Sequence, residues 1–234
     1  AGKKRVFFSC SNVPQQLDYE TNIIKAAAKA KVEYCVKLST AKAVVEQEAG
    51  FGAAHAKAEE LLKESGMAFT SLRAMWFLQN LEADGPVVGP GYTMEGMLKN
   101  GLVSSCFGGK KMGIVDLRDV GEVAAALLVT DDISKHAGKF YDLTGPASVT
   151  LADVVASVSE VVGRPIACKD LDLDDAISAM AETFKIPVEA LGGTKDFLSL
   201  LLTECDYTTN DVEEVTGKPA RPFSVYVKEK FSGQ

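Results

Sequence analysis

The clearest alternation of hydrophobic and polar positions along the chain lies in residues 32–40. Val32, Tyr34, Val36 and Leu38 alternate there with Glu, Cys, Lys and Ser. A period of two residues is typical of a β-strand, because successive side chains of a strand point to opposite faces of its sheet. We therefore predict a strand here, around which the neighbouring elements are arranged.

Strands and helices alternate on both sides of this segment. Residues 6–10 are a short apolar run that predicts a first strand, and residues 15–31 have the spacing of an amphipathic helix. A second helix is predicted at residues 53–65 and a third strand at residues 68–73. Strand–helix–strand units of this kind join parallel strands by helical crossovers. The predicted fold class is therefore α/β, with a parallel doubly wound sheet.

The second half of the chain continues this alternation less regularly. Residues 82–109 are rich in Gly and Pro and have weak periodicity, which predicts an irregular excursion over the sheet edge where ligands bind. Asp119 and Thr150 are expected to cap helices. Further strands are predicted at 112–117, 139–143 and 166–171, and further helices at 120–128, 151–162, 174–183, 187–204 (interrupted at Gly192 and Gly193), from 209 and at 225–231.

Composition narrows the classes of function. The 234 residues are 47% hydrophobic and 24% charged, with a formal net charge of -7. An acidic chain argues against direct binding to nucleic acid or to an anionic membrane, and no apolar run is long enough to span a bilayer. The five cysteines lack metal-ligand spacing and are expected to be buried thiols in a reducing compartment. We therefore expect a cytoplasmic globular protein that holds no metal.

The first predicted strand lies close to the start of the sequence. Ala1 opens the chain, and the apolar strand at residues 6–10 follows almost at once. Strands this apolar are typically covered by neighbours on both sides of a parallel sheet. We therefore expect that an N-terminal portion is absent and that the sheet edge exposes Phe7 and Phe8. A targeting peptide on a longer chain is an open alternative.

Six motifs occur in a specific order over nearly the whole chain. They are Val36-Lys37-Leu38-Ser39, residues 55–66 with Phe69-Thr70-Ser71-Leu72-Arg73, Phe77-Leu78-Gln79-Asn80, Ile114-Val115-Asp116-Leu117-Arg118-Asp119-Val120, Tyr141-Asp142-Leu143-Thr144-Gly145-Pro146 and Asp211-Val212-Glu213-Glu214-Val215-Thr216-Gly217-Lys218-Pro219. Each motif alone is weak, but in this order they resemble the NmrA-like branch of the atypical short-chain dehydrogenase/reductases. The resemblance implies a Rossmann-like sheet, N-terminally incomplete here, with a smaller C-terminal substrate-side subdomain.

The chain departs from that family at its start. The family's Gly-rich loop after its first strand lets the backbone approach a dinucleotide pyrophosphate at a helix N-terminus. Residues 6–10 resemble the family's fourth strand instead, and Ala74 stands where the family usually has Pro. The resemblance implies NADP or NAD as the cofactor, but the segment that holds the pyrophosphate in the family has no counterpart here. This chain as it stands is expected to bind either dinucleotide weakly, with no saturation below the millimolar range.

The resemblance also implies domains and a function. Residues 1–82 and 112–145 would form an incomplete Rossmann-like core, and residues 83–111 and 146–234 the substrate-side subdomain. The implied function is an NAD(P)H-dependent oxidoreductase, NADP-preferring in its complete form, that reduces small carbonyl or quinone substrates. Two alternatives stay open. One is a non-catalytic redox sensor that binds the dinucleotide and regulates a protein partner, and the other is a truncated chain that binds no dinucleotide.

Lys37 is the leading candidate for chemistry. It lies in a strand expected to be covered on both faces, where a charged side chain needs a partner, and the resemblance places it at the nicotinamide end of the cofactor. Ser39 and Thr40 follow at the carboxyl end of the strand and are candidates for hydrogen bonds to a ligand. The alternatives are a lysine whose ammonium reaches solvent and turn-forming roles for the hydroxyls. Replacing Lys37 with Met is expected to change stability little.

His55 and Glu59 form a second candidate pair, four residues apart on a predicted helix. Ordinary short-chain dehydrogenases have a Tyr-x-x-x-Lys pair in the like place, with Tyr as the acid. A His could donate a proton near neutral pH. The alternative is a His at a helix start with a surface partner. The absence of Tyr-x-x-x-Lys favours the sensor, whereas an aromatic-lined excursion favours a substrate pocket.

Two further groups are expected near the cofactor. By resemblance, the turn at Ser9, Cys10 and Ser11 passes the ribose, and Met75, Trp76 and Phe77 wall the nicotinamide or an aromatic substrate. The alternatives are a polar turn and ordinary core packing. The remaining polar residues are given structural roles: Asn80 in fixing the backbone, Asp116, Arg118 and Asp119 in an ion-paired cap, and His136 as a solvated surface residue.

Overall fold

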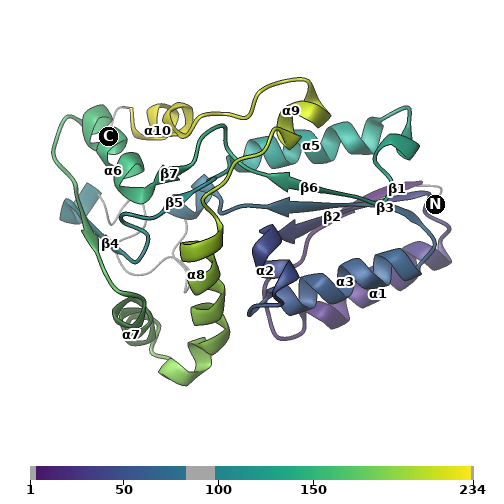
Figure 1. Cartoon of the computed structure of the whole chain (residues 1–234), viewed down its shortest axis with the longest axis horizontal. Helices are drawn as coiled ribbons and strands as arrows, with labels where there is room; N and C mark the ends of the chain where they lie inside the picture. Colours follow the sequence, from purple (N-terminus) through teal and green to yellow (C-terminus); the bar gives the residue numbers. More distant parts are fainter. Residues whose placement is uncertain (1–3, 83–97, 233–234) are drawn as a thin grey trace.

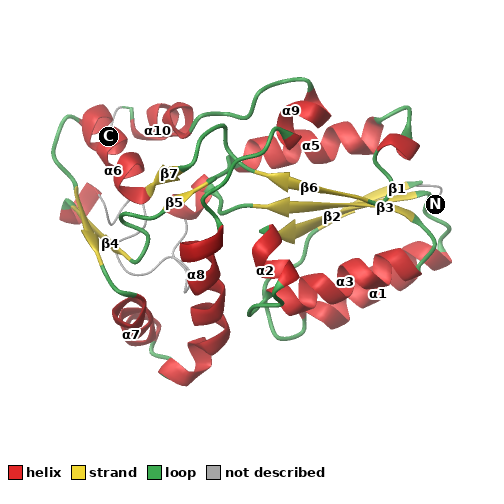
Figure 2. Cartoon of the chain, viewed as in Figure 1, coloured by secondary structure: helices red, strands yellow, loops and turns green. Residues whose placement is uncertain are grey.

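A four-stranded parallel sheet lies at the centre of the molecule, in the order β1-β2-β3-β6 (Figure 1). The computed structural model describes residues 4–82 and 98–232. The strands are β1 (Arg5–Phe8), β2 (Tyr34–Thr40), β3 (Ala68–Ala74) and β6 (Lys139–Leu143). Figure 2 shows helices on both faces of this sheet. The predicted α/β fold with a parallel doubly wound sheet is therefore confirmed.

The first three strands are parallel neighbours, as predicted from the helices that join them. Val36 in β2 is paired with Phe7 in β1 and with Thr70 in β3. Lys37 follows in the same register, between Phe8 and Ser71. The carboxyl ends of the three strands therefore meet at one edge of the sheet.

The two faces of the sheet are covered by different helices. On one face lie α1 (Gln16–Lys29) and α3 (Gly52–Glu64), and on the other lies α5 (Leu117–Val129) (Figure 1). Cys35 packs with Ile24 of α1 and Ala58 of α3 in a hydrophobic cluster. Because side chains two apart on a strand share a face, Lys37 and Ser39 also point towards α1 and α3.

A smaller α/β part lies beyond the carboxyl edge of the sheet. Its strands pair as β4 with β8, in parallel, and as β5 with β7, antiparallel. Its elements are β4 (Leu102–Ser105), β5 (Lys111–Met112), β7 (Val149–Thr150), α6 (Leu151–Val162), β8 (Ala167–Asp170), α7 (Leu173–Phe184), α8 (Gly192–Glu204) and α10 (Phe223–Phe231). Short 3-10 helices occur at Leu78–Glu82, Ile133–Lys135 and Val188–Leu191. Helix α2 (Lys42–Glu46), directly after β2, packs against α8 and so connects the two parts.

Helix α9 (Asp211–Thr216) lies with the main sheet rather than with the smaller part (Figure 1). It packs against α5 and β6. Asp211 Oδ2, at its start, accepts a hydrogen bond of 2.6 Å from the backbone N–H of Asp142 in β6. The domain division predicted from the sequence places this helix in the other part.

Several predicted local features differ from the structure. The strand predicted at residues 112–117 is limited to Lys111–Met112 and one bridge between Val115 and Phe77. Helix α5 starts earlier than predicted because Asp116, and not Asp119, accepts the capping hydrogen bond from the Arg118 N–H at 2.9 Å. Gly192 and Gly193 open α8 instead of interrupting a longer helix. The capping role predicted for Thr150 is confirmed.

The edge of the sheet at β1 exposes one of its two phenylalanines. Phe7 is 37% exposed, whereas Phe8 is 6% exposed. The expectation that an N-terminal portion is absent stays a prediction. Residues 83–97 of the predicted excursion lie outside the described residues. In the described part of the chain, no helix combines the length and apolar character needed to span a membrane.

Candidate functional site

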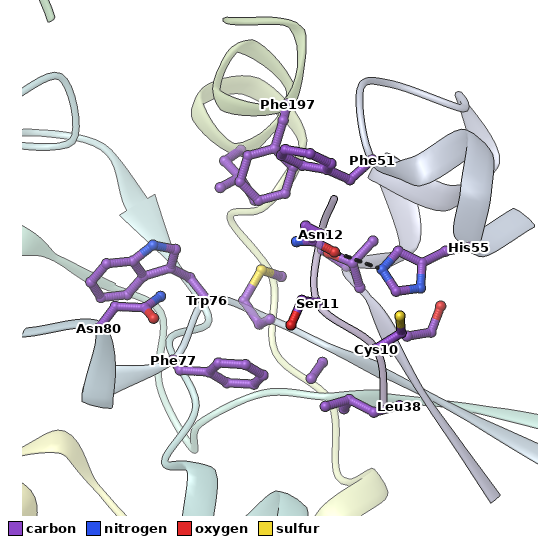
Figure 3. Close-up of a pocket in the computed structure, with 16 residues that line it drawn as sticks. Cys10, Ser11, Asn12, Leu38, Phe51, His55, Trp76, Phe77, Asn80 and Phe197 are labelled. Atoms are coloured by element: carbon purple, nitrogen blue, oxygen red, sulfur yellow. Dashed lines mark hydrogen bonds between the residues drawn. The ribbon is translucent and has the colours of Figure 1, made fainter. Parts of the chain in front are cut away.

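A cavity of about 280 Å³ lies at the carboxyl edge of the sheet (Figure 3). The turn after β1, the end of β2 and the segment after β3 form one side of it, while α3 and α8 form the other. Its walls consist of Cys10, Ser11, Asn12, Leu38, Ser39, Thr40, Ala41, Phe51, His55, Ala74, Met75, Trp76, Phe77, Asn80, Phe197 and Leu201. This is the edge at which parallel sheets bind ligands.

Both sides of the cavity carry aromatic side chains. Phe51, at the start of α3, and Phe197, in α8, meet edge to face with their ring centroids 6.4 Å apart. Trp76 and Phe77 line the cavity from the segment after β3, and Met75 lies beside them. The three residues predicted to wall a nicotinamide or an aromatic substrate therefore do lie on one cavity. A flat, conjugated ligand suits such a lining.

Lys37 does not reach this cavity. Its side chain is completely buried, and its Nζ lies 2.7 Å from Glu20 Oε1, 3.0 Å from His55 Nδ1 and 3.2 Å from the Leu38 carbonyl oxygen. Three acceptors match the three N–H groups of an ammonium. The expectation that this ammonium enters the cleft is therefore wrong in this structure, and so is the alternative of a solvent-reaching lysine. The strand face that carries Lys37 is covered by α1 and α3.

His55, and not Lys37, is the ionisable side chain of this network that lines the cavity. An ammonium only donates hydrogen bonds, so Nδ1 of His55 accepts and the neutral ring holds its proton on Nε2. Nε2 lies 3.3 Å from Asn12 Oδ1, the contact drawn in Figure 3. Burial and the positive charge of Lys37 lower the pKa of His55 to about 3. At physiological pH, His55 is therefore a neutral hydrogen-bond donor and not a protonated acid.

Gln16 supports the same proton position on His55. Its Nε2 lies 3.1 Å from His55 Nε2, and its buried Oε1 has no hydrogen-bond partner among the described residues. The amide oxygen and nitrogen of Gln have the same shape, so exchanging them places the oxygen beside the ring N–H. In that orientation the Gln16 oxygen, like Asn12 Oδ1, lies within hydrogen-bond reach of the ring N–H.

Glu59 is not the partner of His55, contrary to the pair predicted from their spacing. Glu59 Oε1 accepts a hydrogen bond of 2.6 Å from Ser71 Oγ, and Glu59 Oε2 lies 2.8 Å from Arg73 Nη2. Both partners are on β3, one strand away from Lys37. Glu59 therefore neutralises Arg73, and the carboxylate partner in the His55 network is Glu20.

Ser39 lies in the wall of the cavity, and its role as a ligand contact stays a prediction. It is 5% exposed and lines the cavity, and its Oγ has no hydrogen-bond partner in the described part of the chain. Buried hydroxyls are rarely left without a partner in folded proteins. A polar group of a bound ligand would supply that partner, so the residues present fit a ligand with a donor or acceptor at this point.

The turn after β1 contributes two of its three predicted residues. Cys10 and Ser11 line the cavity, whereas Ser9 is exposed and does not. Strand β1 ends at Phe8, so Ser9 already belongs to the turn that follows it. Burial and the nearby Glu20 carboxylate raise the pKa of the Cys10 thiol. Cys10 is thus a neutral thiol in the wall rather than a thiolate nucleophile.

Several site residues could not be identified from the sequence motifs. Gln16 and Glu20 occupy the buried face of α1 together with Ile24 and Ala27. Two polar residues continuing an apolar helical spacing were a usable signal for a buried polar network. Asn12, Phe51, Phe197 and Leu201 carried no such signal, because their places depend on how distant elements pack.

The other polar candidates have structural roles. Asp116 pairs with Arg118 at 2.7 Å, and Asp119 pairs with Arg221, so the predicted ion-paired cap is present. His136 is not simply solvated, because its Nδ1 lies 2.7 Å from the Tyr141 hydroxyl and it is half-buried. Among the described residues, no group of three or more His, Cys, Asp and Glu side chains could hold a metal ion.

The sequence is similar to those of known reductases. No family model matches the chain. It is 32% identical over 219 residues to the (4-alkanoyl-5-oxo-2,5-dihydrofuran-3-yl)methyl phosphate reductase of Streptomyces griseus, which covers 92% of this chain and 72% of that protein. It is 28% identical over 230 residues to an NAD(P)H azoreductase of Xenophilus azovorans, covering 97% of this chain and 75% of that protein.

Solved structures show the same fold. An NADPH-dependent quinone oxidoreductase of Escherichia coli, complexed with NADPH, superposes with a TM-score of 0.79 at 21% identity, over 98% of this chain and 77% of that chain. A variant of NmrA superposes with a TM-score of 0.65 at 15% identity, over 97% of this chain and 74% of that chain. Together with the 32% identity to the Streptomyces griseus reductase, these findings show that the chain belongs to the family of NAD(P)-binding Rossmann-fold reductases.

Proposed function

We propose that the protein is an NmrA-like reductase that uses NADP in preference to NAD and reduces small carbonyl or quinone acceptors in the cavity. One observation carries the proposal. The cavity combines an aromatic lining, a buried Ser39 hydroxyl that has no hydrogen-bond partner among the described residues, and a neutral hydrogen-bond donor at His55. The aromatic lining suits a flat acceptor and a nicotinamide ring. The Ser39 hydroxyl and the His55 N–H suit polar groups on those two molecules.

The residues of the cavity suggest how a cofactor would be held. When bound, a reduced nicotinamide supplies a hydride with its electron pair. Ser39 would bind its polar substituent, Trp76 and Phe77 would flank the ring, and the turn at Cys10 and Ser11 would lie beside the ribose. The preference for NADP is supported by the NADPH named for the quinone oxidoreductase structure.

The loops that follow β1 and β2 lack the glycines of a typical pyrophosphate site. The connection from β1 to α1, residues 9–15, contains no glycine, and a single residue, Ala41, joins β2 to α2. Tight pyrophosphate binding usually depends on a Gly-rich loop at a helix N-terminus. We therefore keep the expectation of millimolar dinucleotide affinity for the chain as it stands.

A conjugated molecule is the acceptor that suits this cavity best. The relatives are named for an azo compound, a quinone and an alkanoyl dihydrofuranone, which are all conjugated acceptors. Such an acceptor gains negative charge on an oxygen or nitrogen when it accepts a hydride. A neutral N–H donor in a mostly apolar cavity stabilises that charge, since hydrogen bonds to ions are stronger where water is excluded.

A second candidate function is a redox sensor that binds the dinucleotide without turnover. The observation that favours it is the contact between His55 Nε2 and Asn12 Oδ1, because the catalytic donor is then already engaged. The two functions differ in one measurable respect. A sensor binds reduced cofactor without consuming it when an acceptor is added, whereas a reductase oxidises it.

The proposal is tested first by binding. Trp76 is the single tryptophan of the chain and lines the cavity, so its fluorescence reports ligand there directly. Titration with NADPH is expected to quench it with saturation in the millimolar range. Ser39→Ala is expected to weaken binding roughly twofold to tenfold, the range for one neutral hydrogen bond. The control Ser199→Ala, exposed on α8, should leave affinity unchanged. Absence of any quenching by NADPH or NADH would contradict binding in this cavity.

A further inference from the structure

Three buried ionisable side chains from three elements form a continuous hydrogen-bonded chain. Glu20 comes from α1, Lys37 from β2 and His55 from α3, and their exposed fractions are 0%, 0% and 4%. Of the three, only His55 lines the cavity. These hydrogen bonds therefore connect the buried ion pair of Glu20 and Lys37 to His55, the hydrogen-bond donor at the proposed site.

Each contact in this chain has a defined direction. Lys37 donates to Glu20 at 2.7 Å and to His55 Nδ1 at 3.0 Å, which leaves the ring proton of His55 on the cavity-facing Nε2. Among the described residues, the other ionisable groups that act on Lys37 are Glu59 from α3 and Cys10 from the turn after β1. Glu59 is engaged by Ser71 and Arg73, and Cys10 is a neutral thiol. The carboxylate in direct contact with the Lys37 ammonium is therefore that of Glu20.

We propose that Glu20, Lys37 and His55 act as a proton relay that delivers one proton to the reduced acceptor. The inference rests on the proposed reductase function and adds roles to its residues. His55 is the catalytic donor, because it alone faces the ligand. Lys37 and Glu20 are positioning residues: Lys37 replaces the proton that His55 gives away, and Glu20 holds Lys37 in place and stabilises its charge.

The proposed step balances in protons and electrons. The acceptor carbon gains a hydride from the reduced nicotinamide, and the π electrons of the acceptor move to its oxygen. That oxygen takes the Nε2 proton of His55. Nδ1 of the same ring takes a proton from Lys37 Nζ at the same time, so the imidazole stays neutral throughout. The products are the reduced acceptor, the oxidised nicotinamide and a neutral Lys37 amine, which regains its proton from solvent by the reverse route once the product has left.

This route explains how a histidine of such low basicity can deliver a proton. A ring that is neutral at physiological pH has no surplus proton, and loss of its only N–H proton would leave an unfavourable anion. A second donor at Nδ1 removes that obstacle. A purely structural ion pair between Glu20 and Lys37 would need no contact with His55.

The tautomer of His55 tests the arrangement without any substrate. The chain has two histidines, His55 and His136, so nitrogen-15 spectra of histidine-labelled protein are simple to assign with His136→Gln. The relay predicts that His55 keeps its proton on Nε2 and does not titrate at mildly acidic pH. A proton on Nδ1, or titration near the ordinary value for histidine, would overturn the proposal.

Kinetics test whether the relay is used. Lys37→Met alone leaves Glu20 buried without its partner and is expected to lower stability, so Glu20→Leu/Lys37→Met is prepared alongside it. With a naphthoquinone and NADPH, both variants are expected to lose roughly a hundredfold in kcat, typical for a lost proton donor. KM for the quinone should stay nearly constant, since neither residue lines the cavity. The control is Lys57→Met, on the exposed side of α3, and it should keep wild-type kcat.

The outcomes separate the relay from the function on which it rests. Wild-type kcat in a folded Glu20→Leu/Lys37→Met variant would overturn the relay and leave the reductase proposal standing. A wild-type protein that binds NADPH but does not oxidise it when any of the proposed acceptors is added would overturn both the reductase proposal and the relay. A loss of kcat accompanied by an equal rise in KM would assign Lys37 and Glu20 to the structure of the cavity and overturn the relay as well.

Discussion

His55 determines much of the chemistry available at the site. It is buried, faces the cavity through Nε2 and receives a hydrogen bond from Lys37 at Nδ1. These surroundings lower its pKa to about 3, far from the near-neutral proton donor expected from the sequence. A neutral imidazole that donates a hydrogen bond can stabilise developing negative charge, and it does so over the whole physiological pH range.

The low pKa of His55 makes stability depend on pH. Below the usual histidine pKa of about 6.5, His55 is protonated in the unfolded chain but stays neutral in the folded chain. The free energy of unfolding therefore decreases as the pH falls. The stabilisation is complete above that value and is lost as the pH falls from there towards 3. We expect His55→Gln to remove a slope of about 1.4 kcal/mol per pH unit from the free energy of unfolding, measured by urea denaturation between about pH 6 and pH 4.

The matched control is His136→Gln. His136 is half-buried, and burial with the nearby Lys139 and Lys135 lowers its pKa less strongly. Its removal should therefore change the same slope by a smaller amount. Equal slopes in wild type and His55→Gln would show that His55 titrates normally in the folded protein, contrary to the geometry found here.

The complete burial of Lys37 makes its charge important for stability. Lys37→Met removes the ammonium that pairs with fully buried Glu20, and breaking a buried pair typically destabilises by about 3–5 kcal/mol. The sequence-based expectation of little change is therefore replaced by a large loss, measured as the free energy of unfolding in urea. Glu20→Leu/Lys37→Met removes both charges and should regain most of that loss. A single variant as stable as wild type would mean that the pair is not formed.

Only part of this site could be predicted from residues alone. The strand period identified Lys37 and Ser39 as neighbours on one face, and that relation is correct. The partner of Lys37 could not be identified, because Glu20 lies on a helix whose rotation depends on packing against the sheet. The spacing of His55 and Glu59 suggested a pair, yet β3 supplies stronger partners for Glu59 in Ser71 and Arg73.

At the scale of elements, the start of α3 is fitted closely against the start of α8. Gly50 has φ +52°, and a Cβ there would collide with the carbonyl oxygen of Gly193. This close approach brings Phe51 next to Phe197, so the aromatic wall of the cavity depends on it. Glycine is needed at residue 50 for its backbone conformation and for its small size.

Gly50→Ala is therefore expected to be strongly destabilising. Strain in the left-handed region and overpacking against Gly193 together should lower the free energy of unfolding by about 3 kcal/mol or more. Gly66→Ala is the control, because Gly66 has φ +71° but nothing lies near its Cβ position. It should lose only about 1–2 kcal/mol, the cost of the conformation itself. Similar losses in thermal or urea unfolding of both variants would argue against the close contact.

Elements with a regular period were predicted well, and elements held by long-range contacts were not. The strands β1, β2, β3 and β6 and the helices between them follow from alternation and helical spacing. The run at residues 112–117 looked like a strand, but it contributes only to a two-residue strand and one bridge, because Asp116 within the run already caps α5. Placement of α9 on α5 and β6 likewise depends on Asp211 reaching the backbone of Asp142.

At the scale of the whole molecule, the cavity lies where the main sheet meets the smaller part. The sheet edge supplies its polar groups, and α8 supplies Phe197 and Leu201 opposite them. Such junctions between two parts of a fold are common places for ligand sites. The arrangement offers a nicotinamide and an acceptor one shared, mostly apolar space.

The absence of glycine from residues 9–15 gives a prediction for the whole cofactor. If the cavity holds mainly the nicotinamide end, reduced nicotinamide mononucleotide should bind nearly as well as NADPH. We expect dissociation constants within about tenfold of each other, a difference of about 1.4 kcal/mol. Trp76 fluorescence measures both. Far tighter binding of NADPH would mean that other residues of this chain hold the pyrophosphate and adenosine.

The proposed activity is the reduction of a conjugated acceptor by a reduced nicotinamide in this cavity. The most direct measurement is the anaerobic oxidation of millimolar NADPH with a naphthoquinone, followed by nicotinamide absorbance, for wild type and for His55→Phe. We expect acceptor-dependent oxidation by the wild type and a loss of roughly a hundredfold in His55→Phe, with Lys57→Met unchanged. Oxidation no faster than in buffer, or full activity in His55→Phe, would contradict it.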